Sequence, residues 1–253
     1  MRGIHPFRTA VVAVLLLMAV ASVAAAGPVL LFDQGHGQRF TADKEGSLQL
    51  SGFAGILKEE GFDVRVGTTT FSAETLSGVD ALVISGPFAP LQPAETEAVL
   101  AFVARGGRLA LMLHIPMPVE NLLHLLEVDY SNYVISEQEH VIEGDRRNFR
   151  LKNLASHPLF ASIDSFSLYG GWALMNIGTK SRVIASTTEK AWADLNGDGR
   201  LSTGDAIQEF SMVMDGSRDA GRFVVFGDDA VFQNKFLDQQ NRQLARNLAN
   251  WLK

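Results

Sequence analysis

Short apolar runs alternate with amphipathic segments in the first half of the chain after residue 27. Residues 28–33, 80–85 and 108–114 are nearly continuous apolar runs, typical of buried strands in a parallel sheet. Residues 47–60 and the segment that begins at Pro93 carry apolar side chains at helical spacing, and they stop at Gly61 and Gly106. This alternation predicts βαβ crossovers, and therefore an α/β fold with a doubly wound, mainly parallel sheet.

The second half of the chain has a different pattern. Residues 130–221 contain short β-prone pieces separated by many turns, at about 133–135, 165–168, 182–186 and 209–214. A buried-strand pattern returns at residues 222–227, and an amphipathic helix is predicted over residues 241–252. We therefore expect a single α/β domain over residues 27–253, with a β-rich insertion of about residues 130–221.

The first 26 residues have the pattern of a secretory signal peptide. Arg2 and Arg8 precede an uncharged apolar stretch that closes with three alanines, Ala24 to Ala26. An uncleaved membrane anchor is the alternative, although the apolar part is short for a span of roughly 20 residues. The sequence thus predicts export to the periplasm or the extracellular space, with no membrane span after cleavage of the signal.

Charge and cysteine content exclude several classes of function. Lys and Arg number 22 against 28 Asp and Glu, and the net charge is −6. Because proteins that bind nucleic acid usually carry a basic face, nucleic acid is not an expected partner. The chain has no cysteine, which excludes disulfides, thiolate metal sites and cysteine nucleophiles.

Residues 194–205 match the twelve-residue D-x-[DN]-x-[DN]-G pattern of a calcium loop. Gly199 permits the sharp turn, and hard oxygen ligands favour Ca²⁺ over a soft transition metal. Two departures from the pattern are the Asp at the twelfth position and β-prone rather than helical flanks, so the loop resembles an EF-hand or dockerin loop on a β-connection. The alternative is a solvated turn without an ion. The expected ligands of Ca²⁺ are Asp194, Asn196, Asp198, Arg200 through its carbonyl, Ser202 and Asp205.

The ends of the predicted strands resemble the class I glutamine amidotransferase-like superfamily. Residues 31–37, 83–87, 106–109 and 224–228 carry the resemblance, which is closest to an exported, non-catalytic branch. It implies a flavodoxin-like sheet. Catalytic members use a cysteine at a strand-to-helix turn, but His114, Ile115 and Pro116 follow the corresponding strand here. The resemblance therefore implies no glutaminase activity.

Polar residues gather where the predicted strands end, the edge at which ligands bind in open parallel sheets. His36 and His114, together with the acids Asp33 and Asp228, could act as general acids and bases or bind a metal ion. Alternatively, the acids cap turns and His36 satisfies backbone groups. Residues 169–172 (YGGW) could form a sugar-stacking surface or a buried aromatic cluster.

Together these patterns predict an exported, calcium-binding, non-catalytic binding or assembly module of the cell envelope. Its expected partner is an envelope protein or a carbohydrate. The alternative is a hydrolase that uses His36, His114, Asp33 and Asp228.

Overall fold

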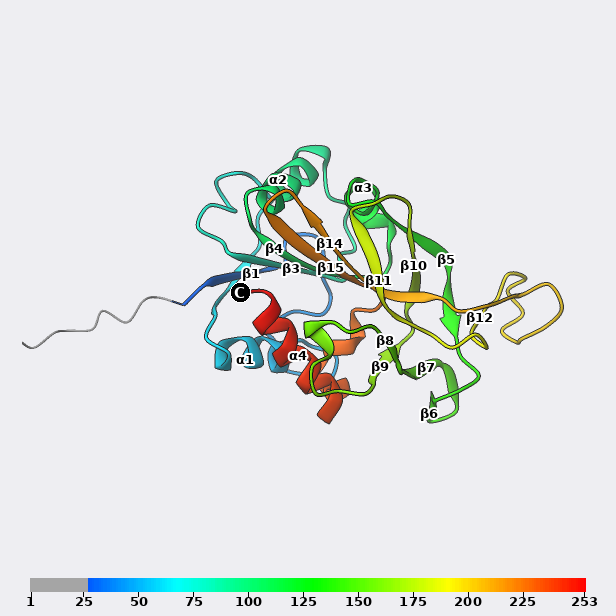
Figure 1. The fold of residues 1–253 in the computed structure, drawn as a ribbon. Helices are drawn as coiled ribbons and strands as arrows, with labels where there is room; N and C mark the ends of the chain where they lie inside the picture. The colour runs from blue at the N-terminus through cyan, green and yellow to red at the C-terminus, as the bar shows by residue number, and fades with distance from the viewer. Residues whose placement is uncertain (1–26) are drawn as a thin grey trace, which may run out of the picture.

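The computed structural model, which describes residues 27–253, consists of a large mixed β-sheet with helices on both faces (Figure 1). The predicted signal peptide lies outside the described residues. The sheet contains twelve strands, ten of which follow the order β13-β12-β5-β10-β14-β15-β4-β3-β1-β2. The α/β class predicted from the sequence is confirmed.

One half of the sheet is parallel. Its five strands are β2 (Asp63–Gly67), β1 (Val29–Asp33), β3 (Ala81–Ser85), β4 (Arg108–Met112) and β15 (Gly221–Phe226). Every pairing between neighbours in this group is parallel, so the carboxyl ends of all five strands lie at one edge. Apart from the edge strand β2, which is largely exposed, the strands are short, buried and apolar, as their sequence patterns predicted.

The other half is antiparallel, so the expectation of a mainly parallel sheet is wrong. Antiparallel pairings join β15 to β14, β14 to β10, β10 to β5 and β5 to β12. The strands concerned are β5 (Val128–Ser136), β10 (Trp172–Asn176), β12 (Trp192–Ala193), β13 (Ala206–Ile207) and β14 (Ser211–Arg218). The sequence analysis expected β-prone pieces in this region as an insertion, but it did not predict that their strands extend the main sheet, because β-bulges and short bridges interrupt the period-2 pattern.

The remaining strands extend the antiparallel half. Strand β11 (Ser181–Ser186) pairs with β14 and with β8 (Asn153–Leu154). A separate three-stranded sheet contains β6 (Val141–Ile142), β7 (Asp145–Leu151) and β9 (Phe166–Tyr169). Between α3 and β15, the regular elements are thus all strands except for one short 3₁₀ helix.

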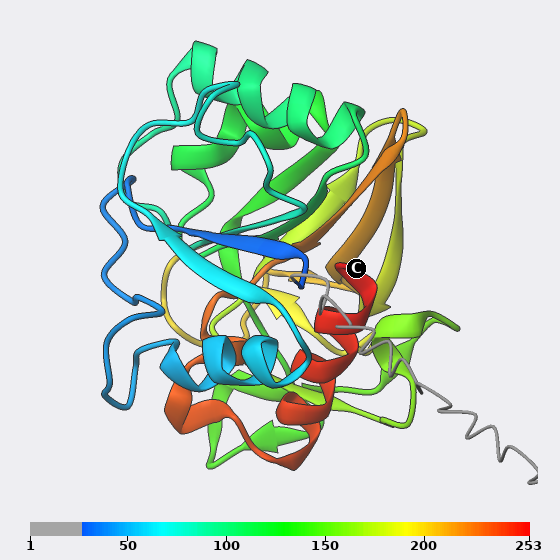
Figure 2. The same ribbon diagram turned by 90° about the vertical axis from the view of Figure 1, so that its left-hand side faces the viewer.

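Four α-helices cover the two faces of the sheet. Helices α1 (Ser51–Glu59) and α4 (Gln239–Trp251) pack on one face, and α2 (Pro93–Ala104) and α3 (Glu120–Leu125) on the other (Figures 1 and 2). Pro93 occupies the first turn of α2, and Gln92 and Glu95 form a capping box. None of the helices in the described part of the chain is both long and apolar enough to span a bilayer.

Short 3₁₀ helices complete the connections. They are η1 (Met117–Val119), η2 (Pro158–Phe160), η3 (Ala230–Phe232) and η4 (Asn234–Phe236). Of these, η3 follows β15 directly. It turns the chain away from the carboxyl edge and leads it toward α4.

Candidate functional site

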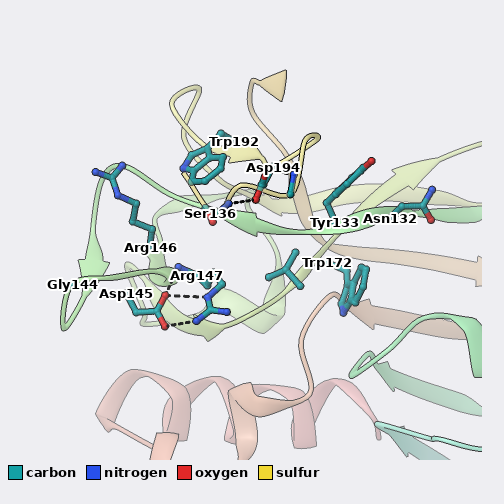
Figure 3. Close-up of a pocket in the computed structure, with 13 residues that line it drawn as sticks. Asn132, Tyr133, Ser136, Gly144, Asp145, Arg146, Arg147, Trp172, Trp192 and Asp194 are labelled. Atoms are coloured by element: carbon teal, nitrogen blue, oxygen red, sulfur yellow. Dashed lines mark hydrogen bonds and ion pairs between the residues drawn. The ribbon is translucent and has the colours of Figure 1, made fainter. Parts of the chain in front are cut away.

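A groove begins at the carboxyl edge of the parallel strands and extends over the antiparallel half of the sheet (Figure 3). It consists of two cavities of about 800 and about 470 Å³. Four residues line both cavities, which makes them one continuous surface: Val134, Asp145, Arg147 and Trp172. Cavities of this size and polarity are typical of small-molecule sites.

Backbone contacts at two glycines create the junction between the halves of the sheet. The amide of Trp172 donates to the carbonyl of Gly227 just after β15 (2.7 Å), and the amide of Ile135 donates to the carbonyl of Gly171 (2.9 Å). A Cβ on Gly227 would collide with the carbonyl of Trp172. These glycines therefore let β10 approach the end of β15 closely and bring Trp172 to the groove.

Trp172 and Tyr133 are the aromatic side chains at one end of the larger cavity (Figure 3). The indole Nε1 of Trp172 donates to the backbone carbonyl of His114 (2.9 Å), which fixes the ring at the boundary between the two cavities. Tyr133 is 38% exposed. Tyr169, by contrast, stacks on Phe236 with ring centroids 3.6 Å apart, so this face of its ring is covered.

Asp145 and Arg147 form an ion pair on β7 that borders both cavities (Figure 3). Arg147 Nε lies 3.2 Å from Asp145 Oδ1 and Nη2 lies 3.2 Å from Oδ2. The hydrogen bond from Arg147 lowers the pKa of Asp145, so both groups are charged at neutral pH. The sequence analysis missed this pair, although the i,i+2 spacing of opposite charges on a strand would have placed both on one face.

His114 and Asp229 form a dyad in the smaller cavity. His114 Nδ1 lies 3.0 Å from Asp229 Oδ1, and the imidazole packs against the rings of Phe40 and Phe88, with centroids 5.4 and 5.0 Å away. The hydrogen bond that Asp229 accepts from His114 raises the pKa of His114, although burial opposes this. Gly86 has φ of 55°, and a Cβ there would collide with Oδ2 of Asp229. Gly86 therefore makes room for the dyad.

Asp228 is buried beside the dyad and lines the same cavity. Its oxygens accept hydrogen bonds from the backbone amides of Tyr169 (2.7 Å) and Ala230 (2.8 Å). Burial, reinforced by the charge of Asp229, raises the pKa of Asp228 to about 8. Through its two hydrogen bonds Asp228 holds the loop after β15. Because its pKa lies above 7, the carboxyl group is neutral at pH 7.

His36 and Asp33 belong to a second cluster, which does not line the groove. His36 Nδ1 lies 2.8 Å from Asp33 Oδ1, and Nε2 lies 2.9 Å from Glu95 Oε1. Burial by itself would lower the pKa of His36, but hydrogen bonds to Asp33 and Glu95 and their charges outweigh it and raise that pKa. The sequence analysis missed Glu95, which lies on α2. Since His36 is only 4% exposed and both ring nitrogens have partners, it ties two loops to α2.

The structure thus separates the four residues of the hydrolase alternative into two groups. His114 and Asp228 border the smaller cavity, and His36 and Asp33 do not. The partner of His114 is Asp229, which was not among the catalytic candidates.

The loop of residues 194–205 joins β12 to β13 and forms one wall of the larger cavity. Its side-chain oxygens accept hydrogen bonds from the loop's own backbone. Asp194 accepts from the amides of Gly197 (2.7 Å) and Gly199 (2.8 Å), and Asp205 accepts from those of Leu195 (3.1 Å) and Ser202 (2.7 Å).

Within residues 27–253, no group of three or more His, Asp or Glu side chains is arranged to hold a metal ion. The structure therefore does not support the identification of this chain as a calcium protein with an EF-hand-like site. The six predicted ligands form a hydrogen-bonded turn: Asp194, Asn196, Asp198, Arg200, Ser202 and Asp205.

The family model described as "Domain of unknown function (DUF4350)" matches residues 42–249. The chain belongs to the DUF4350 family. The match covers both halves of the sheet, the groove and most of α4. No curated protein matches this DUF4350 chain significantly in sequence.

Solved structures resemble the DUF4350 fold at low sequence identity. The mmIFT52 N-terminal domain has a TM-score of 0.70 at 15% identity, covering 88% of this chain and 96% of that domain. The cytoplasmic protein STM1381 from Salmonella typhimurium LT2 has a TM-score of 0.58 at 17% identity, covering 89% and 99%. A ThuA-like protein from Bacteroides uniformis ATCC 8492 has a TM-score of 0.53 at 15% identity, covering 92% and 94%. At these identities the likeness concerns the fold alone.

These findings overturn two expectations from the sequence. The chain belongs to DUF4350 and is structurally similar to the IFT52 domain and the Salmonella proteins. The assignment to the class I glutamine amidotransferase-like superfamily is therefore corrected. That assignment was wrong because apolar strands that end in Gly and Asp occur in many open α/β sheets. Export to the periplasm or beyond is likewise withdrawn, because two of the matched structures, STM1381 and STM3548, are named cytoplasmic proteins.

Proposed function

We propose that this DUF4350 chain is a non-catalytic binding module whose ligand occupies the groove at the carboxyl edge. The observation that carries the proposal is the continuity of the two cavities, which share Trp172 and the Asp145–Arg147 pair. Such a combination of an apolar ring with fixed polar groups is what orients a ligand in a preformed site.

The position of the groove in the fold supports the proposal. We infer that the parallel half is a doubly wound, flavodoxin-like unit, since its strand order β2-β1-β3-β4-β15 has helices on both faces. In open sheets of this kind, ligands bind outside the carboxyl ends of the strands. The groove begins at that edge.

A thermal-shift screen against small polar molecules and peptides tests the proposal. A ligand at one hundred times its Kd should stabilise the protein by roughly 2.7 kcal/mol. Hydrogen–deuterium exchange with that ligand should then show protection in residues 132–136 and 170–172. If protection occurs only elsewhere, or if nothing in the screen stabilises the protein, the proposal is wrong.

A hydrolase is the second candidate, favoured by the His114–Asp229 dyad in the smaller cavity. An imidazole oriented by a buried carboxylate can act as a general base. The residues that line this cavity include no serine or threonine, so the base would have to activate water. Turnover in an ester, amide and glycoside panel that is lost in His114→Gln but kept in His124→Gln would favour the hydrolase over the binding module.

A further inference from the structure

We propose that the groove takes a neutral oligosaccharide, with sugar rings packed on the faces of Trp172 and Tyr133. This inference rests on the proposed function, since it names the ligand class of the same groove. A pyranose ring presents apolar C–H groups on its faces and hydroxyls around its rim. Its site therefore needs flat aromatic surfaces with polar groups beside them.

The two rings come from neighbouring strands and project to opposite sides of β5 at one end of the larger cavity, because Trp172 pairs with Val134 (Figure 3). Trp172 begins β10 and Tyr133 lies on β5, the strand that pairs with β10. Because the indole N–H of Trp172 already donates to the carbonyl of His114, a ligand meets carbon atoms of the ring rather than an unpaired donor. Trp172 borders both cavities, so a ligand that packs on it can extend into either one.

The polar groups match the hydroxyls of a sugar. Asp145 and Arg147 place carboxylate acceptors beside guanidinium donors, and their side chains are 39% and 65% exposed. Two adjacent hydroxyls, each able to donate and accept, can bind such a pair. In the smaller cavity Asp229 is 2% exposed, and its buried Oδ2 has no hydrogen-bond partner in the described part of the chain. A ligand hydroxyl could supply that missing donor.

The charges around the groove favour a neutral ligand. The lining contains three basic groups, Arg146, Arg147 and His114, against the acids Asp145, Asp194 and Asp229, while Asp228 is neutral at pH 7. A site for nucleic acid, phosphate or a sulfated chain would need a positive excess.

The shape of the groove favours several linked sugars over one. The two cavities, of about 800 and about 470 Å³, adjoin one another and share Trp172 among their lining residues. A single sugar would leave most of this volume filled with water. We therefore expect affinity to rise with chain length from the monosaccharide to the tetrasaccharide or beyond.

Calorimetry with neutral oligosaccharides tests the inference. The probes are hexasaccharides of glucose, mannose, xylose and N-acetylglucosamine, with each monosaccharide as a reference. We expect at least one hexasaccharide to bind, more tightly than its monosaccharide. Trp172→Ala should weaken that binding at least tenfold, and Trp172→Phe should keep most of it because the flat face is retained. Trp251→Phe, in α4 and outside the groove, should have no effect.

A second variant keeps the test decisive if Trp172→Ala fails to fold. Tyr133 is exposed, so Tyr133→Ala should leave the melting temperature nearly unchanged while weakening binding about threefold to tenfold. Unchanged affinity in both variants would refute the placement of the sugar on these two rings.

The outcomes also separate the inference from the proposed function. If no hexasaccharide binds but a peptide or an acidic saccharide protects the groove in hydrogen–deuterium exchange, the ligand class is wrong and the binding module stands. If no ligand of any class protects the groove, both are wrong.

Discussion

Replacing His36 with leucine should destabilise the protein strongly and in a pH-dependent way. The imidazole is buried between Asp33 and Glu95, at 2.8 and 2.9 Å from their oxygens. Leucine has a similar volume but offers neither carboxylate a donor. Removing one partner of a buried ion pair costs about 3–5 kcal/mol.

The carboxylates keep some of their other partners, which reduces this figure. Asp33 also accepts from the amide of Gly35 (3.0 Å), and Glu95 accepts from the amides of Phe71 and Gln92 (both 2.9 Å). We therefore expect a loss at the lower limit, about 3 kcal/mol at pH 6.

The pH dependence follows from the raised pKa of His36. A histidine whose pKa is raised on folding stabilises the native state fully below its unfolded pKa of 6.5, and this stabilisation is lost as pH rises through the folded value. The difference between wild type and His36→Leu should therefore be larger at pH 6 than at pH 9. Titrating groups that do not contact His36 are common to both proteins and cancel in this difference.

Urea denaturation at the two pH values measures this effect. His124→Leu is the matched control, because His124 is exposed on α3 and should give little change at either pH. A loss below about 1 kcal/mol at pH 6, or an equal loss at pH 6 and pH 9, would refute the view that His36 is held as a cation between two acids.

Three further predictions concern other parts of the molecule. Asp228→Asn should cost about 1–3 kcal/mol in thermal melts, because an amide NH₂ would face one of the backbone donors at Tyr169 and Ala230; an unchanged melting temperature would contradict this. Phe232→Ala should cost about 3–5 kcal/mol in urea denaturation, since the ring is fully buried; a loss below about 1 kcal/mol would show that the core repacks. Binding of Ca²⁺ by the loop of residues 194–205 is untested and stays a prediction of the sequence. It implies a higher melting temperature in millimolar Ca²⁺ than in EGTA, and equal melting temperatures would mean that the loop is only a turn.

The parallel half of the sheet could be predicted from the sequence because its strands are buried on both faces. The apolar runs at residues 28–33, 80–85 and 108–114 became β1, β3 and β4 with shifts of only one or two residues. In the antiparallel half, two-residue strands such as β12 and β13 have no periodicity to detect. Their pairing depends on partners far away in the chain, which a local pattern does not encode.

The candidate site was predictable only in part. The rule that ligands bind at the carboxyl edge placed His114 and Asp228 correctly beside a cavity. It also placed His36 there, although a glutamate from α2 holds that ring in the interior. The groove's other wall comes from β5 and β7, whose position follows from long-range antiparallel pairing.

The position of β15 has a consequence for how the chain folds during synthesis. This strand is made after both of its neighbours, yet it lies in the middle of the sheet, where Val224 pairs with Ala110 on one side and Asp215 on the other. The two halves of the sheet cannot join until it has left the ribosome. Until then, the apolar edges of β4 and β14 are open to association with other chains. We therefore expect folding that waits for β15, is blocked when β15 is removed, and is aided by chaperones that shield strand edges.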